Sequence, residues 1–347
     1  MKDANDLSII NCHKANTQVV MFSGILKSIK DVKIGDYVMS SDSKAIKVKH
    51  IIKGTDKLYI IKDLLSHYMY SVNQNYILSL RFVPCKNIKS YDYKFQINWF
   101  DNINICEKSI IFNYNKYTEP FVKMYANAYF NSINENKIVD ISIYDFLQLP
   151  KPLQKKFEII RHVVYFRNKP VQMDPYMYGS MDGINIYNMI ESKKIYDRYK
   201  FNSISIRLEY IAGVIDNFGY IYNNKYKIDV YNDCTYSNDL IYMIRSVGIN
   251  VSFIESKHID TSQLNIDDNN ENIYTLTLYG ARILDIPVKI KKINPNIKDE
   301  EKSRIRRNFV IYADHINNNI ISDCYGIEFE KNEKYLINNF IVSNSCY

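Results

Sequence analysis

The residue types that could do chemistry are few in this sequence, and most stand at no recognisable spacing. The six cysteines, Cys12, Cys85, Cys106, Cys234, Cys324 and Cys346, are widely scattered along the 347 residues. They include no CxxC pair and no spacing typical of metal ligands. The pattern therefore predicts reduced thiols in an intracellular compartment.

Two short apolar turns that contain glycine carry the most suggestive carboxylates. The segments MYGSMDG, which contains Asp182, and IAGVIDNFG, which contains Asp216, look like degenerate copies of one motif. A basic run with Lys289, Lys291 and Lys292 follows them. On its own this run is explained equally well as a functional basic segment and as a solvated strand edge.

The elements around these residues change type twice along the chain. Short apolar segments separated by turn-formers from Gln18 to Lys62 predict an all-β unit, and 68–82 is a further strand candidate. Helices are expected around 120–134, 143–157, 211–218 and 239–247, and strands at 221–231 and 274–279. The tail from Tyr325 to Val342 returns to β. An insertion inside an all-β domain would produce this order.

Composition limits the classes of protein. The length favours two domains, and 46% hydrophobic with 14% aromatic residues predicts a folded chain. A formal charge of +7 permits a polyanionic partner. The N-terminal stretch lacks a signal-peptide pattern, and no run reaches membrane-spanning length. We expect a protein of the nucleus or cytoplasm that is neither secreted nor bound to a membrane.

The chain resembles the intein-derived LAGLIDADG homing endonucleases, the family of the yeast vacuolar-ATPase intein and the HO endonuclease. Cys12 to Gly24 and Ile29 to Met39 are similar to the opening intein block. Tyr325-Gly326-Ile327 and the stretch from Tyr335 to Cys346 look like the closing blocks, and the two glycine-containing turns lie between them. This combination is more specific than any single motif.

The resemblance implies a mainly β Hint (intein-type) domain with an inserted α/β LAGLIDADG endonuclease domain. The implied boundaries are a leader or extein-like segment at 1–11, the Hint domain at 12–84 and 323–347, a Hint-associated DNA-recognition region at 85–174, and a reduced endonuclease domain at 175–322. We expect a monomer whose insert has pseudo-two-fold symmetry.

Protein splicing, as the resemblance implies it, would begin at Cys12, whose thiol would attack the preceding carbonyl. The family's Thr-x-x-His segment matches Val72 to Asn75, so Asn75 replaces the imidazole. At the closing end Asn344 takes the His position, Ser345 the Asn position and Cys346 the nucleophile position. A shift by one residue would make Asn344 the cyclising residue and Ser345 the nucleophile. In either register splicing is expected to be lost, and Cys12 is better explained as a buried residue opening a strand.

DNA cleavage in the family needs one acidic metal ligand before the final glycine of each motif. In the second motif that position is Phe218, which cannot bind a hard cation, and Asp216 matches an earlier capping position. In the first motif Asp182 could ligate if the helix ends early, whereas an ungapped alignment puts Ile184 at the ligand position. Only 184–210 separates the motifs, too little for the usual first sheet. Cleavage is therefore expected to be impaired or lost.

The partner that the resemblance implies is double-stranded DNA. Lys291 and Lys292 could supply the lysine that the family keeps near its metals. The candidate DNA contacts are Lys89, Lys94, Lys155, Lys156, Arg161, Arg167 and Lys169. Three functions stay open: a DNA-binding relative without cleavage, an active Mg²⁺-dependent nuclease rebuilt around Asp182 and Asp216, and an inactive relic.

Overall fold

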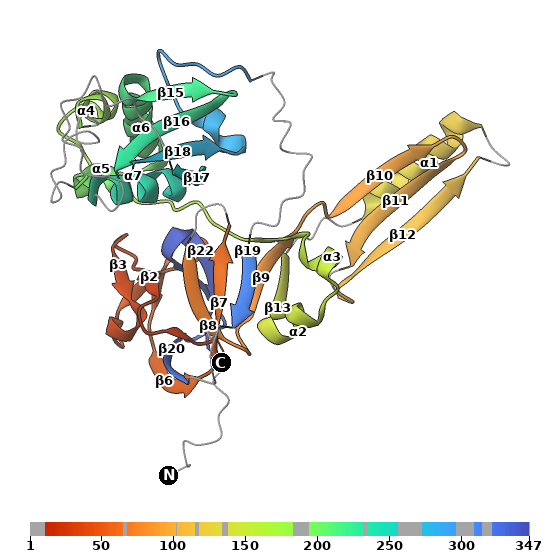
Figure 1. Ribbon diagram of the computed structural model, residues 1–347, viewed down its shortest axis with the longest axis horizontal. Helices are drawn as coiled ribbons and strands as arrows, with labels where there is room; N and C mark the ends of the chain where they lie inside the picture. The colour runs from red at the N-terminus through yellow and green to blue at the C-terminus, as the bar shows by residue number, and fades with distance from the viewer. Residues whose placement is uncertain are drawn as a thin grey trace, which may run out of the picture.

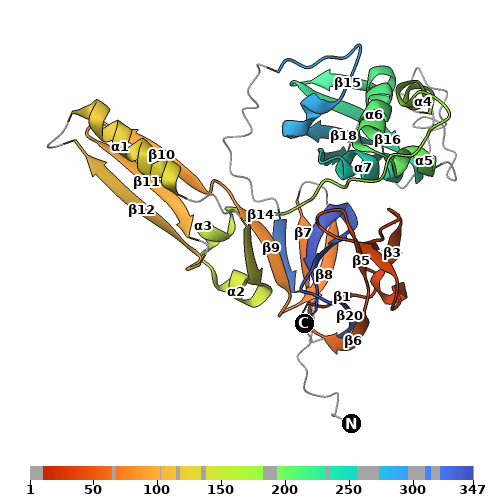
Figure 2. The same cartoon turned by 180° about the vertical axis from the view of Figure 1, so that it is seen from behind.

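The structure is a computed structural model that describes residues 11–64, 68–101, 103–114, 118–133, 138–182, 194–231, 235–255, 273–295, 309–313 and 321–346. Within these ranges the chain forms a mainly β body, an α/β body inserted into it, and an arm that projects from the β body (Figures 1 and 2). No helix in these ranges is both long enough and apolar enough to cross a membrane.

One sheet of the β body joins the two ends of the sequence. Its strand order is β19-β7-β8-β1-β20-β6. The strands are β1 (His13–Lys14), β6 (His50–Asp56), β7 (Leu58–Asp63), β8 (Met69–Asn73), β19 (Phe309–Ala313) and β20 (Ser322–Glu328). His13 in β1 pairs with Val72 on one side and Tyr325 on the other. The residues just before β1 are thereby brought to the end of the chain.

A second sheet packs against this one through a shared apolar core. Its order is β13-β9-β22-β21-β2-β3, and β14 also pairs with β9. The strands are β2 (Gln18–Val20), β3 (Leu26–Ser28), β9 (Ile77–Phe82), β13 (Ile138–Ser142), β14 (Phe157–Ile159), β21 (Lys334–Ile337) and β22 (Ile341–Asn344). Beside them lie the pair β4 (Tyr37–Met39) and β5 (Ala45–Lys47) and the short helices α2 (Ile143–Gln148) and α3 (Lys151–Gln154). Leu78, Leu80 and Phe82 of β9 alternate into the core, as the period of a strand requires.

The arm is a three-stranded sheet covered on one face by a helix. It contains β10 (Lys86–Tyr91), β11 (Lys94–Asp101), β12 (Cys106–Asn113) and α1 (Glu119–Ser132). Phe95 and Ile97 of β11 are buried against Val122 and Ala126 of α1. Alternate residues of the strands therefore point to α1, and the others form the uncovered face.

The inserted body has helices on one face of a four-stranded sheet. The helices are α4 (Pro175–Asp182), α5 (Asp197–Lys200), α6 (Ile204–Phe218) and α7 (Thr235–Ser246). The sheet order is β15 (Gly219–Tyr222), β16 (Lys225–Tyr231), β18 (Ile273–Tyr279) and β17 (Asn250–Glu255). Polar contacts tie this body to the β body: the Tyr242 hydroxyl donates to the carbonyl oxygen of Gly24 at 2.6 Å, and Arg245 donates to Asn339.

Three predicted elements are interrupted in the structure. The strand expected over 68–82 is β8 and β9, with a turn at Gln74 and Asn75. The strand expected over 221–231 is a hairpin, because Asn223 and Asn224 both take positive φ values of 49° and 56°, the backbone of a tight two-residue turn. The helix expected over 143–157 ends at Gln148, since Pro150 disfavours helical backbone at the residue before it.

Strands from two of the other expected regions pair with strands of the β body. Strands β13 and β14, expected in the DNA-recognition region 85–174, pair with β9 of the β body. Strand β19, expected in the insert at 175–322, pairs with β7, and its Phe309 is buried in the core of the β body. β13, β14 and β19 each bury apolar residues in the core of the β body. The sequence pattern predicts that such segments are strands but does not show which sheet they join.

Candidate functional site at the junction and the helix pair

The peptide bond between Asn11 and Cys12 is held from both sides. The amide of Cys12 donates to Oδ1 of Asn73 at 3.2 Å, and the amide of Asn73 donates to the carbonyl oxygen of Cys12 at 3.2 Å. On the other side the thiol of Cys346 donates to the carbonyl oxygen of Asn11 at 3.1 Å. Three distant parts of the sequence thus meet at one peptide, which we call the junction.

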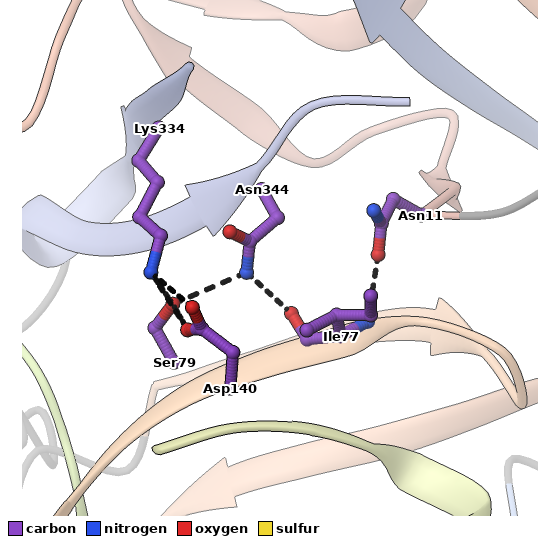
Figure 3. A network of polar contacts seen from close by, with 6 residues as sticks. All are labelled: Asn11, Ile77, Ser79, Asp140, Lys334 and Asn344. Atoms are coloured by element: carbon purple, nitrogen blue, oxygen red, sulfur yellow. Dashed lines mark hydrogen bonds and ion pairs between the residues drawn. The ribbon is translucent and has the colours of Figure 1, made fainter. Parts of the chain in front are cut away.

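The side chain of Asn11 fastens the junction to the second sheet. Asn11 has a left-handed backbone with φ of 61°, a conformation that asparagine tolerates better than most residues. Its Nδ2 donates to the carbonyl oxygen of Ser345 at 2.7 Å, and its Oδ1 accepts from the amide of Ile77 at 2.6 Å. Asn344 donates to the carbonyl oxygen of the same Ile77 at 2.8 Å, so both ends of the chain are bound to one residue of β9 (Figure 3).

The residue expected at the imidazole position, Asn75, does not contact the junction in any hydrogen bond among the described residues. Asn75 is exposed in the turn between β8 and β9, away from the junction. Asn73 contacts the Cys12 amide instead, and the buried Tyr76 lies beside the closing strand, where its hydroxyl donates to Oγ of Ser343 at 3.0 Å. The position of Asn75 in the family segment therefore stays a prediction, while Asn73 and Tyr76 are the residues of this turn that lie near the junction.

The closing residues favour the first of the two registers considered. Cys346 is the residue that touches the Asn11 carbonyl, as a residue at the nucleophile position would. The hydroxyl of Ser345 donates to Oδ1 of Asn332 at 3.3 Å, which engages it away from the junction. Asn344 donates to Ser79 at 3.1 Å, and Ser79 and Asp140 both contact Lys334 (Figure 3). Asn344 therefore serves here as a strand-to-strand contact.

The thiols at the junction are held in their neutral form. The hydrogen bond with Cys324, together with burial, raises the pKa of Cys12 far above the ordinary thiol range. Burial raises the pKa of Cys346 to about 12. Because the thiolate is the nucleophile, neither cysteine is activated in this arrangement.

The one imidazole near the junction among the described residues is a poor base. Burial lowers the pKa of His13 to about 3. Its Nε2 lies 2.9 Å from Oγ of Ser343, so it is directed at a hydroxyl and not at a thiol. The junction therefore has one thiol, that of Cys346, 3.1 Å from a carbonyl oxygen, and the imidazole nearby is a poor base.

Helices α4 and α6 pack against each other through glycine. A Cβ atom at Gly179 would lie 2.1 Å from the carbonyl oxygen of Tyr210, and one at Gly213 would lie 2.0 Å from the carbonyl oxygen of Tyr176. Any side chain larger than a hydrogen would force the two backbones apart. Gly179 and Gly213 occupy equivalent positions of the two motifs, and so do Tyr176 and Tyr210. Each glycine contacts the tyrosine of the other motif, so the helix pair has local two-fold symmetry.

The carboxylates follow the same symmetry. The hydroxyl of Tyr176 donates to Asp216 at 3.0 Å, and the hydroxyl of Tyr210 donates to Asp182 at 2.7 Å. Asp182 is thus the equivalent of Asp216, which favours the ungapped alignment of the two motifs. In that alignment the position of Phe218 corresponds to Ile184, which lies outside the described residues.

Asp216 is fully engaged by the backbone that crosses the end of α6. Its oxygens accept from the amides of Lys289, Ile290 and Lys291 at 2.6 to 3.1 Å. Burial alone would raise the pKa of Asp216, but these amides and the Tyr176 hydroxyl outweigh it and lower the pKa. The carboxylate therefore stays ionised while it holds the chain segment in place.

Lys291 caps the end of α6. Its Nζ donates to the carbonyl oxygens of Ile215 at 3.1 Å and Gly219 at 2.6 Å. Partial burial lowers its pKa. The structure separates it from Lys292, which is exposed, and places Lys289 over the ring of Tyr176 at 3.8 Å from the centroid.

The described residues do not fit the Mg²⁺ that the resemblance implies. Asp182 is buried to 6% exposure with Oδ2 facing Tyr210, and Asp216 accepts from backbone amides and Tyr176. Phe218 has no oxygen ligand for a hard cation. In the ranges that the structure describes, no group of three His, Cys, Asp or Glu residues is arranged to hold a metal ion.

The candidate DNA contacts divide into exposed and engaged residues. Lys89, Lys155, Arg167 and Lys169 are exposed, and Lys94 lies over the ring of Tyr91 at 5.3 Å. Arg161 and Lys156 are instead engaged within the fold, with Asp63 and with Glu107. Because Asp63 is almost fully buried, its ion pair with Arg161 is part of the fold, and a contact of Arg161 with DNA stays a prediction.

Several residues of these sites were missed in the sequence. Asn73, Tyr76 and Ser343 surround the junction, and only the turn at Gln74 and Asn75 would have indicated them. Tyr176 and Tyr210 stand three residues before the motif glycines, so the repeated Tyr-x-x-Gly spacing in both motifs was an available signal.

Comparison with known proteins gives one family match. Residues 12–162 match the family described as Hom_end-associated Hint. A crystal structure of the gp41-1 intein with three substitutions is 22% identical, covering 20% of this chain and 52% of that chain, with a TM-score of 0.18. A second gp41-1 intein structure is 18% identical, covering 30% of this chain and 89% of that chain, with a TM-score of 0.19. The match spans about half the length of the first of these structures. No curated protein matches. On the family match, the chain contains a Hint domain of the intein and HO type.

Proposed function

We propose that this chain is a DNA-binding homologue of the intein-derived homing endonucleases, whose LAGLIDADG-type insert has kept its scaffold and lost cleavage. The partner is double-stranded DNA, and binding needs no divalent cation. Protein splicing is lost as well, because the Cys346 thiol is held protonated and His13, the imidazole near the junction, is a poor base.

The observation that carries this proposal is the reciprocal pairing at the ends of α4 and α6. Tyr176 binds Asp216 and Tyr210 binds Asp182, across helices that touch through Gly179 and Gly213. Two parallel helices in such close contact support a LAGLIDADG-type core, a DNA-binding scaffold. The same bonds occupy the carboxylates that a rebuilt metal site would need, which argues against the active nuclease.

The charge on the insert suits a phosphate backbone. Lys227 lies over the ring of Tyr222 at 4.3 Å on the hairpin of β15 and β16. Lys225 belongs to the same hairpin, and Lys289 and Lys292 are exposed beside the end of α6. Aromatic and basic side chains on a sheet next to a helix pair can bind DNA phosphates and sugars without cleaving them.

A salt titration of duplex binding tests the proposal. Affinity of the full chain for a duplex of mixed sequence is measured by fluorescence anisotropy in EDTA at several salt concentrations. Because each phosphate contact releases counterions, the logarithm of affinity should fall linearly with the logarithm of salt, with a slope of about −0.9 per contact. The double variant Lys225→Gln, Lys227→Gln should lower both affinity and slope.

A matched control is Lys44→Gln, which removes an exposed lysine of the β body that pairs with Asp42. It should leave affinity and slope unchanged. Absence of binding, or binding that ignores salt, would contradict the proposal and leave the inactive relic as the better description.

A further inference from the structure

The uncovered face of the arm has a regular arrangement of side chains. Strand register places Asn87, Asn98 and Ser109 in one row across the three strands. The next row holds Lys89, Gln96 and Ile111, and the row after it holds Tyr91, Lys94 and Asn113. We call these nine residues the amide face. Helix α1 covers the opposite side, so this is the side of the sheet that the arm presents outward.

Charge on the amide face has one sign. Its only ionised side chains are Lys89 and Lys94, and none of the nine residues is acidic. Glu107, two residues before Ser109 on the same side of β12, is paired with Lys156. A surface with two cations and no unpaired carboxylate is complementary to a polyanion.

Three amides on this face form a ladder of hydrogen bonds. Nε2 of Gln96 donates to Oδ1 of Asn98 at 3.0 Å, and Nδ2 of Asn98 donates to Oδ1 of Asn87 at 2.9 Å. An amide has two N–H hydrogens and two lone pairs on its oxygen. Each of the three therefore still has a donor and an acceptor to offer after the ladder has formed, with its orientation already set.

One donor and one acceptor on the same amide match the edge of adenine in the major groove, where N7 accepts and the N6 amino group donates. Ile111 stands directly across from Gln96 and is 48% exposed, at the place where an apolar side chain would meet the methyl group of thymine. The major groove admits a two-stranded β-ribbon, and β11 and β12, which carry Gln96, Asn98 and Ile111, form such a pair in an arm that projects from the rest of the protein (Figures 1 and 2).

We propose that the amide face reads A·T base pairs in the major groove of duplex DNA, with Gln96 and Asn98 contacting adenine, Ile111 contacting thymine, and Lys89 and Lys94 contacting phosphates. The inference rests on the proposed DNA binding and adds the base that is read and the residues that read it. Because the ladder already orders the amide side chains, they lose less conformational entropy when they bind DNA.

Duplexes that contain 7-deazaadenine test this reading. The analogue removes the N7 acceptor from the major groove and leaves base pairing and the minor groove intact. Affinities of the full chain are compared for an A·T-rich duplex and for the same duplex with 7-deazaadenine at every adenine. A good bidentate contact is worth about tenfold or more in affinity, so the wild-type chain should bind the analogue at least about tenfold more weakly.

Variants assign the effect to the face. The double variant Gln96→Met, Asn98→Ala should bind both duplexes with equal affinity, because it lacks the reading amides. Lys89→Gln should weaken binding to both duplexes by the same factor and lower the salt slope by about one. Thermal unfolding of each variant serves as the fold check, since these side chains contribute little to the core.

The outcomes distinguish a failure of base reading from a failure of DNA binding. Equal wild-type affinity for the two duplexes would overturn the base reading while leaving DNA binding intact. Sensitivity to the analogue that survives in the double variant would overturn the assignment to the amide face. No complex with either duplex would overturn DNA binding itself, and the base reading with it.

Discussion

The junction and the helix pair both bring reactive side chains close together, but they differ in what restrains those side chains. At the junction the Cys346 thiol lies 3.1 Å from the Asn11 carbonyl oxygen. Burial raises the pKa of this thiol to about 12, so it stays protonated at neutral pH. At the helix pair Asp182 and Asp216 are present, but their oxygens accept hydrogen bonds from tyrosines and backbone amides.

The difference separates the contacts that build a scaffold from the groups that a reaction would need. The contacts that position a site are also the contacts that stabilise the fold, such as the glycine interface of α4 and α6. A reaction would depend on the charge state or identity of a few side chains, and here burial lowers the pKa of His13 while Phe218 offers no carboxylate. Substitutions at those positions can abolish activity while the surrounding packing stays intact.

The largest effect is expected from filling the glycine interface. Gly213→Val places atoms where the Tyr176 carbonyl oxygen and the Ser180 amide nitrogen lie 2.0 and 2.8 Å from the first added carbon. Overpacking against backbone should destabilise the insert by about 3 kcal/mol, measured by chemical denaturation. Ser205→Ala, an exposed change on the same helix, should alter stability by less than about 0.5 kcal/mol. Equal stability of the two variants would show that the helices are not in close contact.

The junction should make stability depend on pH. The folded chain keeps His13 neutral down to about pH 3, whereas the unfolded chain binds a proton near pH 6.5. The unfolded state therefore binds more protons in this window, and stability should fall by about 1.4 kcal/mol for each pH unit below 6.5. His13→Gln should remove most of this slope in urea titrations, and His50→Gln, an exposed change, should not. A slope that persists in the first variant would place its cause elsewhere.

The two Tyr–Asp pairs should differ in strength. Tyr210→Phe removes the hydroxyl that faces Asp182, which is buried to 6% exposure, and should cost about 2 kcal/mol. Tyr176→Phe should cost about 1 kcal/mol or less, since Asp216 retains three backbone amides. Denaturant unfolding of both variants measures the comparison. The reverse order would mean that Asp216 depends on its tyrosine more than on the backbone.

The smallest effect is expected at the junction peptide itself. Incubation with hydroxylamine, which traps thioesters, should release no fragment ending at Asn11, because the thiols of Cys12 and Cys346 stay protonated at neutral pH. Mass spectrometry of the intact chain is the measurement. Cys346→Ala should look the same as the wild type. A fragment that appears only when Cys346 is present would mean that the junction is still reactive.

Much of the architecture could be predicted from the sequence. The order β, then αβ, then β, the helix at α7 and the two glycine motifs all follow from local patterns, and the structure contains them. The turn at Gln74 and Asn75 could not be predicted, since a period of two continues through the turn and hides it. In the structure Asn73, just before this turn, contacts the Cys12 amide, and Tyr76, just after it, contacts Ser343.

Residues defined by register or burial were also out of reach. The amide face depends on which residues of β10, β11 and β12 stand side by side, and no single strand contains that information. In the sequence Arg161 does not differ from the other basic residues, and only the structure shows its ion pair with the buried Asp63. Charge and composition indicate what a residue can do, whereas long-range pairing decides whether it is available.

The central claim is that DNA binding persists without metal and without cleavage, and one paired measurement tests it most directly. The full chain is titrated with a labelled duplex library in EDTA and in Mg²⁺, and the same mixtures are run on denaturing gels. The account predicts equal affinity under both conditions and full-length DNA throughout. Binding that requires Mg²⁺, or nicked or linear product in its presence, would contradict it.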